Sequence, residues 1–102
     1  MRIIKDSRLR EFAKQYSRAS GSLKNWRTVI RQAHWQSFED LKNTFSSADQ
    51  ITLPNGYRVV VFNIGGGAFR LITAVHFNRG IVYIRKFLPH AQHSKEDWKN
   101  DP

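Results

Sequence analysis

The stretch from Gly56 to Leu88, GYRVVVFNIGGGAFRLITAVHFNRGIVYIRKFL, decides the fold. It contains three runs rich in Val, Ile, Phe and Tyr, at residues 56–66, 68–77 and 81–88, which turn-forming residues separate. Runs of this composition between glycine and asparagine residues are typical of β-strands joined by tight turns. The sequence therefore predicts a meander of three antiparallel strands, with turns at residues 65–67 and 78–80.

The pairing of the last two strands can be predicted from the turn between them. If Arg79 and Gly80 form a two-residue turn, Phe77 lies opposite Val82. One face of the sheet is then apolar and the other open, whereas a shift of one residue mixes the two sets. The apolar face would hold Phe69, Leu71, Val75, Phe77, Val82, Ile84 and Leu88, and the open face Arg70, Ile72, His76, Tyr83, Arg85 and Phe87.

The first half of the chain has apolar residues at helical spacing, after a short strand at residues 2–5. Asp6 or Ser7 would cap the first helix, which ends in the turn-forming segment 17–22. A second helix would begin at about Leu23, and a third, short helix would cover residues 38–45. The predicted fold class is α+β, a single domain over residues 1–102 with N-terminal helices packed on a mainly antiparallel sheet.

The composition excludes several classes of protein. No apolar run approaches the roughly 20 residues of a membrane helix, and the chain starts without the apolar stretch of a signal peptide. Cysteine is absent, which excludes disulfides and thiolate zinc sites. We therefore expect a cytoplasmic protein. The net charge of +9 favours nucleic acid as the partner, ahead of an acidic protein or an anionic membrane.

The predicted helices carry their cations in stripes. Residues 1–36 contain nine Lys and Arg residues but only the acids Asp6 and Glu11. Like charges three or four residues apart destabilise a helix slightly. The stripes therefore suggest a surface for RNA or an acidic protein, and the alternative is a merely solvated surface. They consist of Arg10, Lys14 and Arg18 on the first helix and of Lys24, Arg27 and Arg31 on the second.

The predicted open face carries side chains that suit a phosphodiester. Arg70 and Arg85 can each donate two hydrogen bonds to phosphate oxygens, and Tyr83 can stack on a base. His76, and His90 just beyond the strand, can exchange a proton near neutral pH. Cleavage of RNA by its own 2′-hydroxyl needs a base, an acid and stabilisation of the developing charge, but no metal. The alternative is that these are ordinary surface side chains.

Two other kinds of site fit the sequence poorly. His90 and His93 have His-x-x-His spacing, but zinc needs at least one further protein ligand, and no spacing recommends another His, Asp or Glu. The NIGGG segment at 63–67 lacks the pattern of a phosphate-binding loop and lies between two strands. We therefore expect neither a metal ion nor another cofactor.

Three segments, HWQSFEDLKNTFSSADQI (34–51), FNIGGGAFRLITAVHF (62–77) and IVYIRKFLPHAQHSKEDW (81–98), resemble the HigB family of bacterial toxins in the RelE/ParE superfamily. That family has a Val-Phe-Asn-Ile-Gly-Gly-Asn strand and turn, then Tyr-Arg-Leu-Ile, and later a Thr-His-Ala-Glu-Tyr-Asp segment. The resemblance spans about residues 32–98 and is fairly specific, because several motifs occur in order at the right spacing.

This resemblance implies a RelE-like, microbial-ribonuclease-type fold and an mRNA interferase, which is an endoribonuclease that cuts mRNA, typically in the ribosomal A site. Its partners would be mRNA, the ribosome and a cognate helix-turn-helix antitoxin that holds it inactive. Asn63, Arg70 and His90 match residues of the family motifs. Arg85 falls on the strand that carries a functional arginine in related toxins.

The chain departs from the family pattern at the turn and beyond the last strand. Gly67 replaces the family's Asn, and Pro89 replaces Thr. Gln92, His93 and Ser94 stand where Glu, Tyr and Asp are usual, so His93 would take the place of the tyrosine. An imidazole is aromatic and titrates near neutrality, so it can stack on a base or transfer a proton.

Two hypotheses for the function follow. The first is a metal-independent endoribonuclease whose helical stripes bind the ribosome or the antitoxin. Its catalytic residues would be Arg70, Arg85, His90 and His93, and its RNA-binding residues Asn63, His76, Tyr83 and Lys86. The second is a non-catalytic toxin or interaction module with the same fold, which binds RNA or a protein target.

Overall fold

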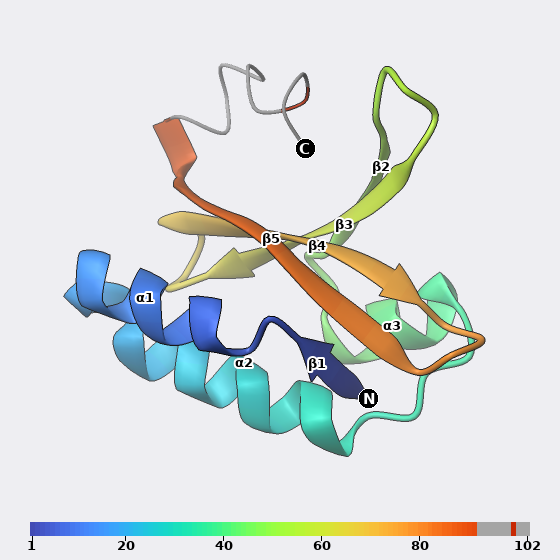
Figure 1. The fold of residues 1–102 in the computed structure, drawn as a ribbon, viewed down its shortest axis with the longest axis horizontal. Coiled ribbons are helices and arrows are strands. Elements are labelled where there is room, and N and C mark those ends of the chain that lie inside the picture. Colours follow the sequence, from blue (N-terminus) through green and yellow to red (C-terminus); the bar gives the residue numbers. More distant parts are fainter. Residues whose placement is uncertain (92–98, 100–102) are drawn as a thin grey trace.

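The computed structural model describes residues 1–91 and Lys99. The elements are β1 (Arg2–Ile4), α1 (Ser7–Gln15), the 3-10 helix η1 (Ser17–Ala19), α2 (Ser20–Gln32), α3 (Phe38–Thr44), β2 (Asp49–Thr52), β3 (Arg58–Ile64), β4 (Phe69–His76) and β5 (Ile81–Pro89). In Figure 1, α1 and α2 lie along one face of the sheet. The predicted α+β class is therefore confirmed, with helices packed on a mainly antiparallel sheet.

The sheet has five strands in the order β1-β5-β4-β3-β2. Strands β2 to β5 pair antiparallel, and β1 pairs parallel to β5, with Ile3 opposite Val82. The sequence analysis missed β2, although the Asn55-Gly56 pair that follows it is a strong hairpin signal. Figure 1 shows that the tip of the β2–β3 hairpin extends beyond the sheet on the side away from α1 and α2.

The turn between β4 and β5 is longer than predicted. His76 lies opposite Ile81, so the turn contains four residues instead of two. Backbone hydrogen bonds from Arg79 N to His76 O (3.1 Å) and from Gly80 N to Phe77 O (3.3 Å) close it. The predicted pairing is therefore wrong by two residues. Because a shift of two preserves the alternation of a strand, the side chains next to the turn keep their predicted faces.

A β-bulge in β5 changes the faces farther along the strand. Thr73 pairs with Ile84, but Ile72 pairs with Lys86, so Arg85 is the extra residue between the two pairs. An extra residue reverses the alternation of every side chain that follows it. The prediction from sequence assumed regular alternation along β5, so the predicted faces are wrong only for the residues that follow Arg85.

The bulge exchanges the predicted positions of Phe87 and Leu88. Phe87 is buried on the helical side, where its ring stacks on Phe69 (centroids 5.1 Å apart) and on Phe12 of α1 (5.4 Å). Leu88 packs instead on the other face, against a small buried cluster that includes Ile72. The aromatic stack thus fastens the end of β5 to α1.

The main core lies between the helices and the sheet. Trp26 of α2 packs edge-to-face on Phe62 of β3, and Phe45, after α3, packs on the same ring. The most deeply buried members of this core are Ala19, Leu23, Trp26, Ile30, Leu41, Ala48, Val60, Phe62, Leu71, Val82 and Ile84. All three predicted helical faces contribute to it, as their periodicity indicates.

One predicted helix start is wrong, and one predicted capping bond is absent. Helix α2 starts at Ser20 instead of Leu23, because η1 already turns the chain and leaves residues 20–22 to form the first helical turn. Asp6 precedes α1, but its side chain makes no capping hydrogen bond. Its carboxylate accepts hydrogen bonds from Nε (2.8 Å) and Nη2 (2.7 Å) of Arg27 instead.

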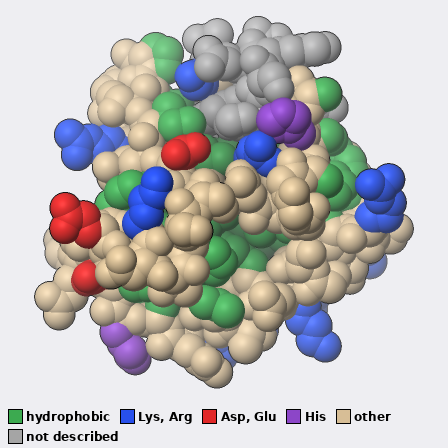
Figure 2. Space-filling model, turned by 180° about the vertical axis from the view of Figure 1, so that it is seen from behind, with side chains coloured by type: hydrophobic (Ala, Val, Ile, Leu, Met, Phe, Trp, Pro, Cys, Tyr) green, Lys and Arg blue, Asp and Glu red, His purple; other side chains and the backbone are tan. Residues whose placement is uncertain are grey.

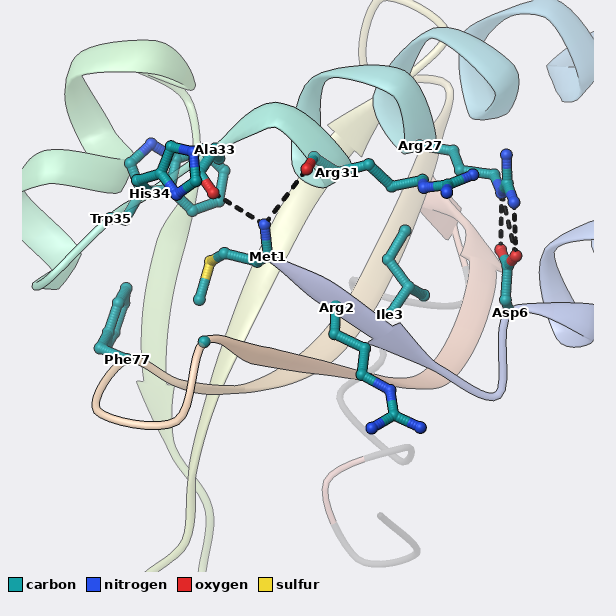
Figure 3. Close-up of a pocket in the computed structure, with 11 residues that line it drawn as sticks. Met1, Arg2, Ile3, Asp6, Arg27, Arg31, Ala33, His34, Trp35 and Phe77 are labelled. Atoms are coloured by element: carbon teal, nitrogen blue, oxygen red, sulfur yellow. Dashed lines mark hydrogen bonds and ion pairs between the residues drawn. The ribbon is translucent and has the colours of Figure 1, made fainter.

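The C-terminal end of α2 meets β1 at the edge of the molecule shown in Figure 3. The Met1 amino group donates hydrogen bonds to the carbonyls of Ile30 (2.9 Å) and Ala33 (2.7 Å). The last carbonyls of a helix lack a regular partner within it. Here the Ile30 carbonyl also accepts from the amide of the cap residue Ala33 (3.1 Å), and the amino group adds a further donor at this end of α2. Together with the Asp6–Arg27 ion pair, these bonds hold β1 and the start of α1 against α2.

The Asp6–Arg27 ion pair predicts a pH dependence of stability. The hydrogen bonds from Arg27 hold the pKa of Asp6 below its ordinary value. A carboxyl with a lowered folded-state pKa contributes stability above its unfolded-state pKa and loses it as pH falls through the folded-state pKa. We expect Asp6→Asn to lower the Tm by a few degrees at neutral pH, and by less as the solution is acidified below about pH 4.

The control for this measurement is Glu11→Gln, which removes an exposed carboxylate from the same helix. Thermal unfolding by circular dichroism from pH 7 to pH 2.5 would compare the three proteins. An equal loss in both variants would mean that net charge, and not the ion pair, sets the difference.

Candidate functional site

Two predicted site residues lie side by side on the open face of the sheet. Asn63 of β3 pairs directly with Arg70 of β4. Their chain neighbours Phe62 and Leu71 are fully buried in the core under the helices. Because successive side chains of a strand point to opposite faces, Asn63 and Arg70 project from the face that the helices leave uncovered.

The bulge adds Lys86 to this face. Lys86 lies opposite Ile72, which is two residues from Arg70 on β4 and shares its face. With regular alternation this lysine would have pointed toward the helices. The bulge therefore brings a cation of β5 to the same face as Arg70.

The far end of the open face carries aromatic side chains. Tyr83 pairs with Ala74, and its ring meets the His76 ring edge-to-face with centroids 5.7 Å apart. His76 is exposed, and Tyr83 is one of two large apolar side chains that the described residues expose. Both predicted RNA-binding residues thus lie on the predicted face, several residues along the strands from Arg70.

Arg70 is anchored to the glycine turn that connects β3 and β4. Its Nη1 donates to the carbonyl of Gly67 at 2.6 Å and to that of Phe69 at 3.2 Å. Gly65, Gly66 and Gly67 all have positive φ, the region that glycine enters most easily. The turn therefore holds the half-buried guanidinium in place through its own backbone, while the other nitrogens remain as donors for a ligand.

The same turn also holds the backbone of His90. The His90 amide donates to the carbonyl of Ala68 at 3.0 Å, and Pro89 pairs with Phe69 at the end of β5. His90 is exposed and starts a helical turn of backbone. The turn thus brings three of the predicted site residues, Asn63, Arg70 and His90, to one end of the sheet. His93 lies outside the described residues.

The predicted helical stripes do not form one uniform surface. Arg10, Lys14, Lys24 and Arg31 are exposed, whereas Arg27 is half-buried and engaged with Asp6. Arg10 and Lys24 border a groove of about 380 Å³ between α1 and α2, whose floor is apolar. A cationic rim around an apolar floor can accept an acidic amphipathic segment.

Arg18 lies apart from the rest of its stripe. It belongs to η1, and it lines a hollow of about 390 Å³ together with Ala68 of the glycine turn and Pro89. Arg18, which was predicted to bind the ribosome or the antitoxin, therefore lies at the same end of the molecule as Arg70 and His90.

Arg2 is a cation of the open face that the sequence analysis did not assign. Parallel pairing places it opposite Ile81, whereas its neighbour Ile3 packs toward the core. In Figure 3 the Arg2 side chain points away from α2. The segment Arg-Ile-Ile-Lys at residues 2–5 does not indicate which strand it pairs with. Only the sheet topology could show that Arg2 lies on this face.

A cavity lies away from the glycine turn. It has a volume of about 750 Å³ and lies between β1 and the end of α2, as Figure 3 shows. Phe77 and Gly80 line it, which places it at the opposite end of the β4–β5 hairpin from the glycine turn. Of the described residues predicted to be catalytic, Arg70, Arg85 and His90, none lines it. The candidate site therefore lies at the glycine turn and not in this cavity.

Charge on the surface is unevenly distributed. Figure 2 shows Lys and Arg side chains around much of the rear surface, with the visible acidic side chains gathered on one side. Within residues 1–91 and Lys99, no three His, Cys, Asp or Glu residues are grouped to hold a metal ion. No helix of that part is long and apolar enough to cross a membrane.

Comparison with known proteins places this fold and site in a class. Residues 19–96 match the sequence profile of the HigB toxins, described as the RelE-like toxic component of a toxin-antitoxin system. The chain is 27% identical over 93 residues to the mRNA interferase toxin HigB of Escherichia coli K12, an alignment that covers 91% of this chain and 88% of the relative. The mRNA interferases HigB of Escherichia coli O157:H7 and Shigella flexneri match equally well.

The class is thus the RelE-like toxins of toxin-antitoxin systems, and the profile covers well over half of the chain. The chain belongs to the HigB toxin family. This confirms the resemblance that its sequence motifs carry.

The glycine turn predicts a specific order of stability among variants. Gly67 has φ +96°, and a Cβ atom there would lie 3.8 Å from Nη1 of Arg70, an ordinary contact. The strain is therefore in the backbone. We expect Gly67→Val to lower the free energy of unfolding by about 1–3 kcal/mol, and Gly67→Asn by less, because asparagine enters positive φ more easily.

Urea unfolding at neutral pH would measure these differences. Gly21→Ala in α2 is the matched control, because nothing lies near its added Cβ atom, and it should be neutral or slightly stabilising. If Gly67→Val were as stable as the wild type, the turn would not need glycine at this position.

Proposed function

We propose that residues 1–102 form a single toxin domain that acts in the cytoplasm as a metal-independent endoribonuclease, and that it cleaves mRNA on the open face of its sheet at the glycine turn. The supporting observation is that Asn63, Arg70 and His90 gather at this turn, with Lys86 on the same face as Arg70. Family membership supports the same function, since the named relatives are mRNA interferases.

Cleavage in this proposal uses the nucleophile that RNA itself contains. The 2′-oxygen attacks the adjacent phosphorus and the bond to the 5′-oxygen breaks, which leaves a 2′,3′-cyclic phosphate and a 5′-hydroxyl. A base takes the proton of the 2′-hydroxyl and an acid protonates the 5′-oxygen. His90 is our candidate for one of these roles, and His93 for the other.

Charge stabilisation is the role that we assign to Arg70. The phosphate gains negative charge in the transition state, and a preorganised donor stabilises that charge without reorienting. Arg70 meets this requirement because its Nη1 is already bonded to the turn. Arg85, at the bulge, would bind the scissile phosphate together with Arg70. Asn63 and Lys86 would hold neighbouring parts of the RNA backbone, and Tyr83 and His76 would contact bases.

The partners in this proposal are the ribosome and a helix-turn-helix antitoxin. The exposed cations of α1 and α2 would contact ribosomal RNA, whose phosphates attract such stripes. The groove between Arg10 and Lys24 would hold an acidic segment of the antitoxin. Arg27 would serve through its ion pair with Asp6, which fixes one wall of that groove.

Substitution of Arg70 tests the catalytic proposal. We expect Arg70→Ala to reduce cleavage by about 100-fold or more, the range seen when one preorganised donor is removed. Arg70→Lys should recover only part of the rate, because lysine keeps the charge but not the paired donors. Growth after induction, together with mapping of mRNA 5′ ends, would measure both effects.

The matched control is Arg58→Ala, which also removes one arginine, but an exposed one that lies in β3 on the face opposite to Val59 and Asn63. It should cut close to wild-type level. Arrested growth with intact mRNA in the wild type would favour the non-catalytic alternative. So would an Arg70→Ala variant that lost RNA binding and toxicity to the same extent.

Metal independence can be tested separately. The toxin would be dialysed against EDTA to remove any bound metal ion and then added to purified ribosomes that carry mRNA. It should cleave the mRNA at the rate of the untreated toxin. The chemistry above requires only protein groups and the 2′-hydroxyl. A loss of activity that Zn²⁺ or Mn²⁺ restored would contradict it.

A further inference from the structure

The tip of the β2–β3 hairpin exposes an aromatic side chain that no role assigned above uses. Tyr57 is 67% exposed, against 37% for Tyr83, the other exposed large apolar residue of the described part. A tyrosine leaves water readily, because its ring is apolar and only its hydroxyl needs a partner. So large an exposed ring next to a candidate RNA face raises the question of what it contacts.

The backbone around Tyr57 is well fixed. Leu53 N donates to the Tyr57 carbonyl at 2.7 Å, and Gly56 N donates to the Leu53 carbonyl at 2.9 Å. The amide of Tyr57 donates to Oδ1 of Asn55 at 3.0 Å. These three bonds hold the tip in one conformation, so little entropy is lost when the ring meets a ligand.

Strand pairing places Tyr57 on the same face as the candidate site. The bond between Leu53 and Tyr57 continues the β2–β3 ladder one step beyond the Thr52–Arg58 pair. Leu53 packs with Val59 and the other buried residues of the open face. By the two-residue alternation of strands, Tyr57 faces the same way as Val59 and Asn63.

We infer that the RNA has a second contact at the β2–β3 hairpin, apart from the glycine turn, where Tyr57 stacks on a base of the substrate strand. Tyr57 and Asn63 are six residues apart in one strand, which corresponds to about 20 Å. A single strand of a few nucleotides covers that distance, so the stacked base would lie a few nucleotides from the cut. This inference rests on the proposed ribonuclease function.

The surroundings of Tyr57 favour RNA over a protein partner. Its neighbours Pro54, Asn55 and Arg58 are exposed, and the apolar residues beneath it, such as Leu53 and Val59, are already buried. A protein interface has an apolar core of several residues, which this tip lacks. A single exposed ring, on a chain with a net charge of +9, instead suits a single-stranded base, which binds by stacking on one aromatic side chain.

The test compares Tyr57→Ala, Tyr57→Phe and the wild type. Removal of one base stack should lower the efficiency of mRNA cleavage by Tyr57→Ala about 5- to 100-fold. The positions of the cuts should stay the same, because Arg70 still binds the phosphate that is cleaved. Tyr57→Phe keeps the ring and should cut within about twofold of wild type, since stacking does not need the hydroxyl. Thermal unfolding should be unchanged in both, because the side chain is exposed.

A second measurement detects the contact directly. Ribosomes carrying mRNA with 4-thiouridine at each position near the cut would be irradiated with the inactive Arg70→Ala toxin. Mass spectrometry should then find the crosslink on the peptide that contains Tyr57, from a base a few nucleotides from the cut.

The outcomes separate this inference from the proposed function. If the wild type cleaves mRNA but Tyr57→Ala cleaves it equally well and no crosslink reaches the hairpin, the inference is wrong and the ribonuclease proposal stands. If Tyr57→Ala cleaves normally but escapes its antitoxin, the tip is a protein contact, which also overturns the inference. If the wild type does not cleave mRNA at all, the ribonuclease proposal fails first.

Discussion

The bulge at Arg85 is the constraint on which both faces of the sheet depend. Up to Ile84 the strand β5 follows the alternation expected from its sequence, and after Arg85 it follows the opposite one. Phe87 therefore reaches the stack with Phe69 and Phe12, which fastens the sheet to α1. The same reversal directs Lys86 to the open face. One extra residue thus links the packing of the core to the charge of the candidate site, and neither could change without the other.

The glycine turn plays a comparable role for the reacting groups. It bonds to the Arg70 side chain through one carbonyl and to the His90 backbone through another, so its conformation sets the positions of both. The family's usual asparagine after the glycine pair can also adopt positive φ. Gly67 therefore preserves the backbone while it removes a polar side chain from beside Arg70. The replacement is compatible with the arginine position that the ribonuclease proposal needs.

Sequence patterns predicted the helices, four of the five strands and the two-faced sheet, because the composition and periodicity of each segment indicate its structure. They also placed Arg70, His76 and Tyr83 on one face, because two-residue alternation survives a register error of two residues. The bulge was not predictable, since Arg85-Lys86 looks the same with or without an extra residue. The position of Arg2 depends on a pairing with β5 that is remote in sequence, and the ion pair of Asp6 replaced the cap that local rules predict.

The parallel pairing of β1 with β5 also has a consequence for the order in which the molecule is made. β5, the last strand synthesised, lies inside the sheet between β1 and β4, so β1 has no strand to pair with until residues near 80 have been translated. Contacts so distant in the chain form late and slowly compared with local ones. A nascent chain therefore has its helices and the first hairpin before β5 can join β4 to β1. The face that carries Asn63, Arg70 and Lys86 is thus completed late in the formation of the described fold.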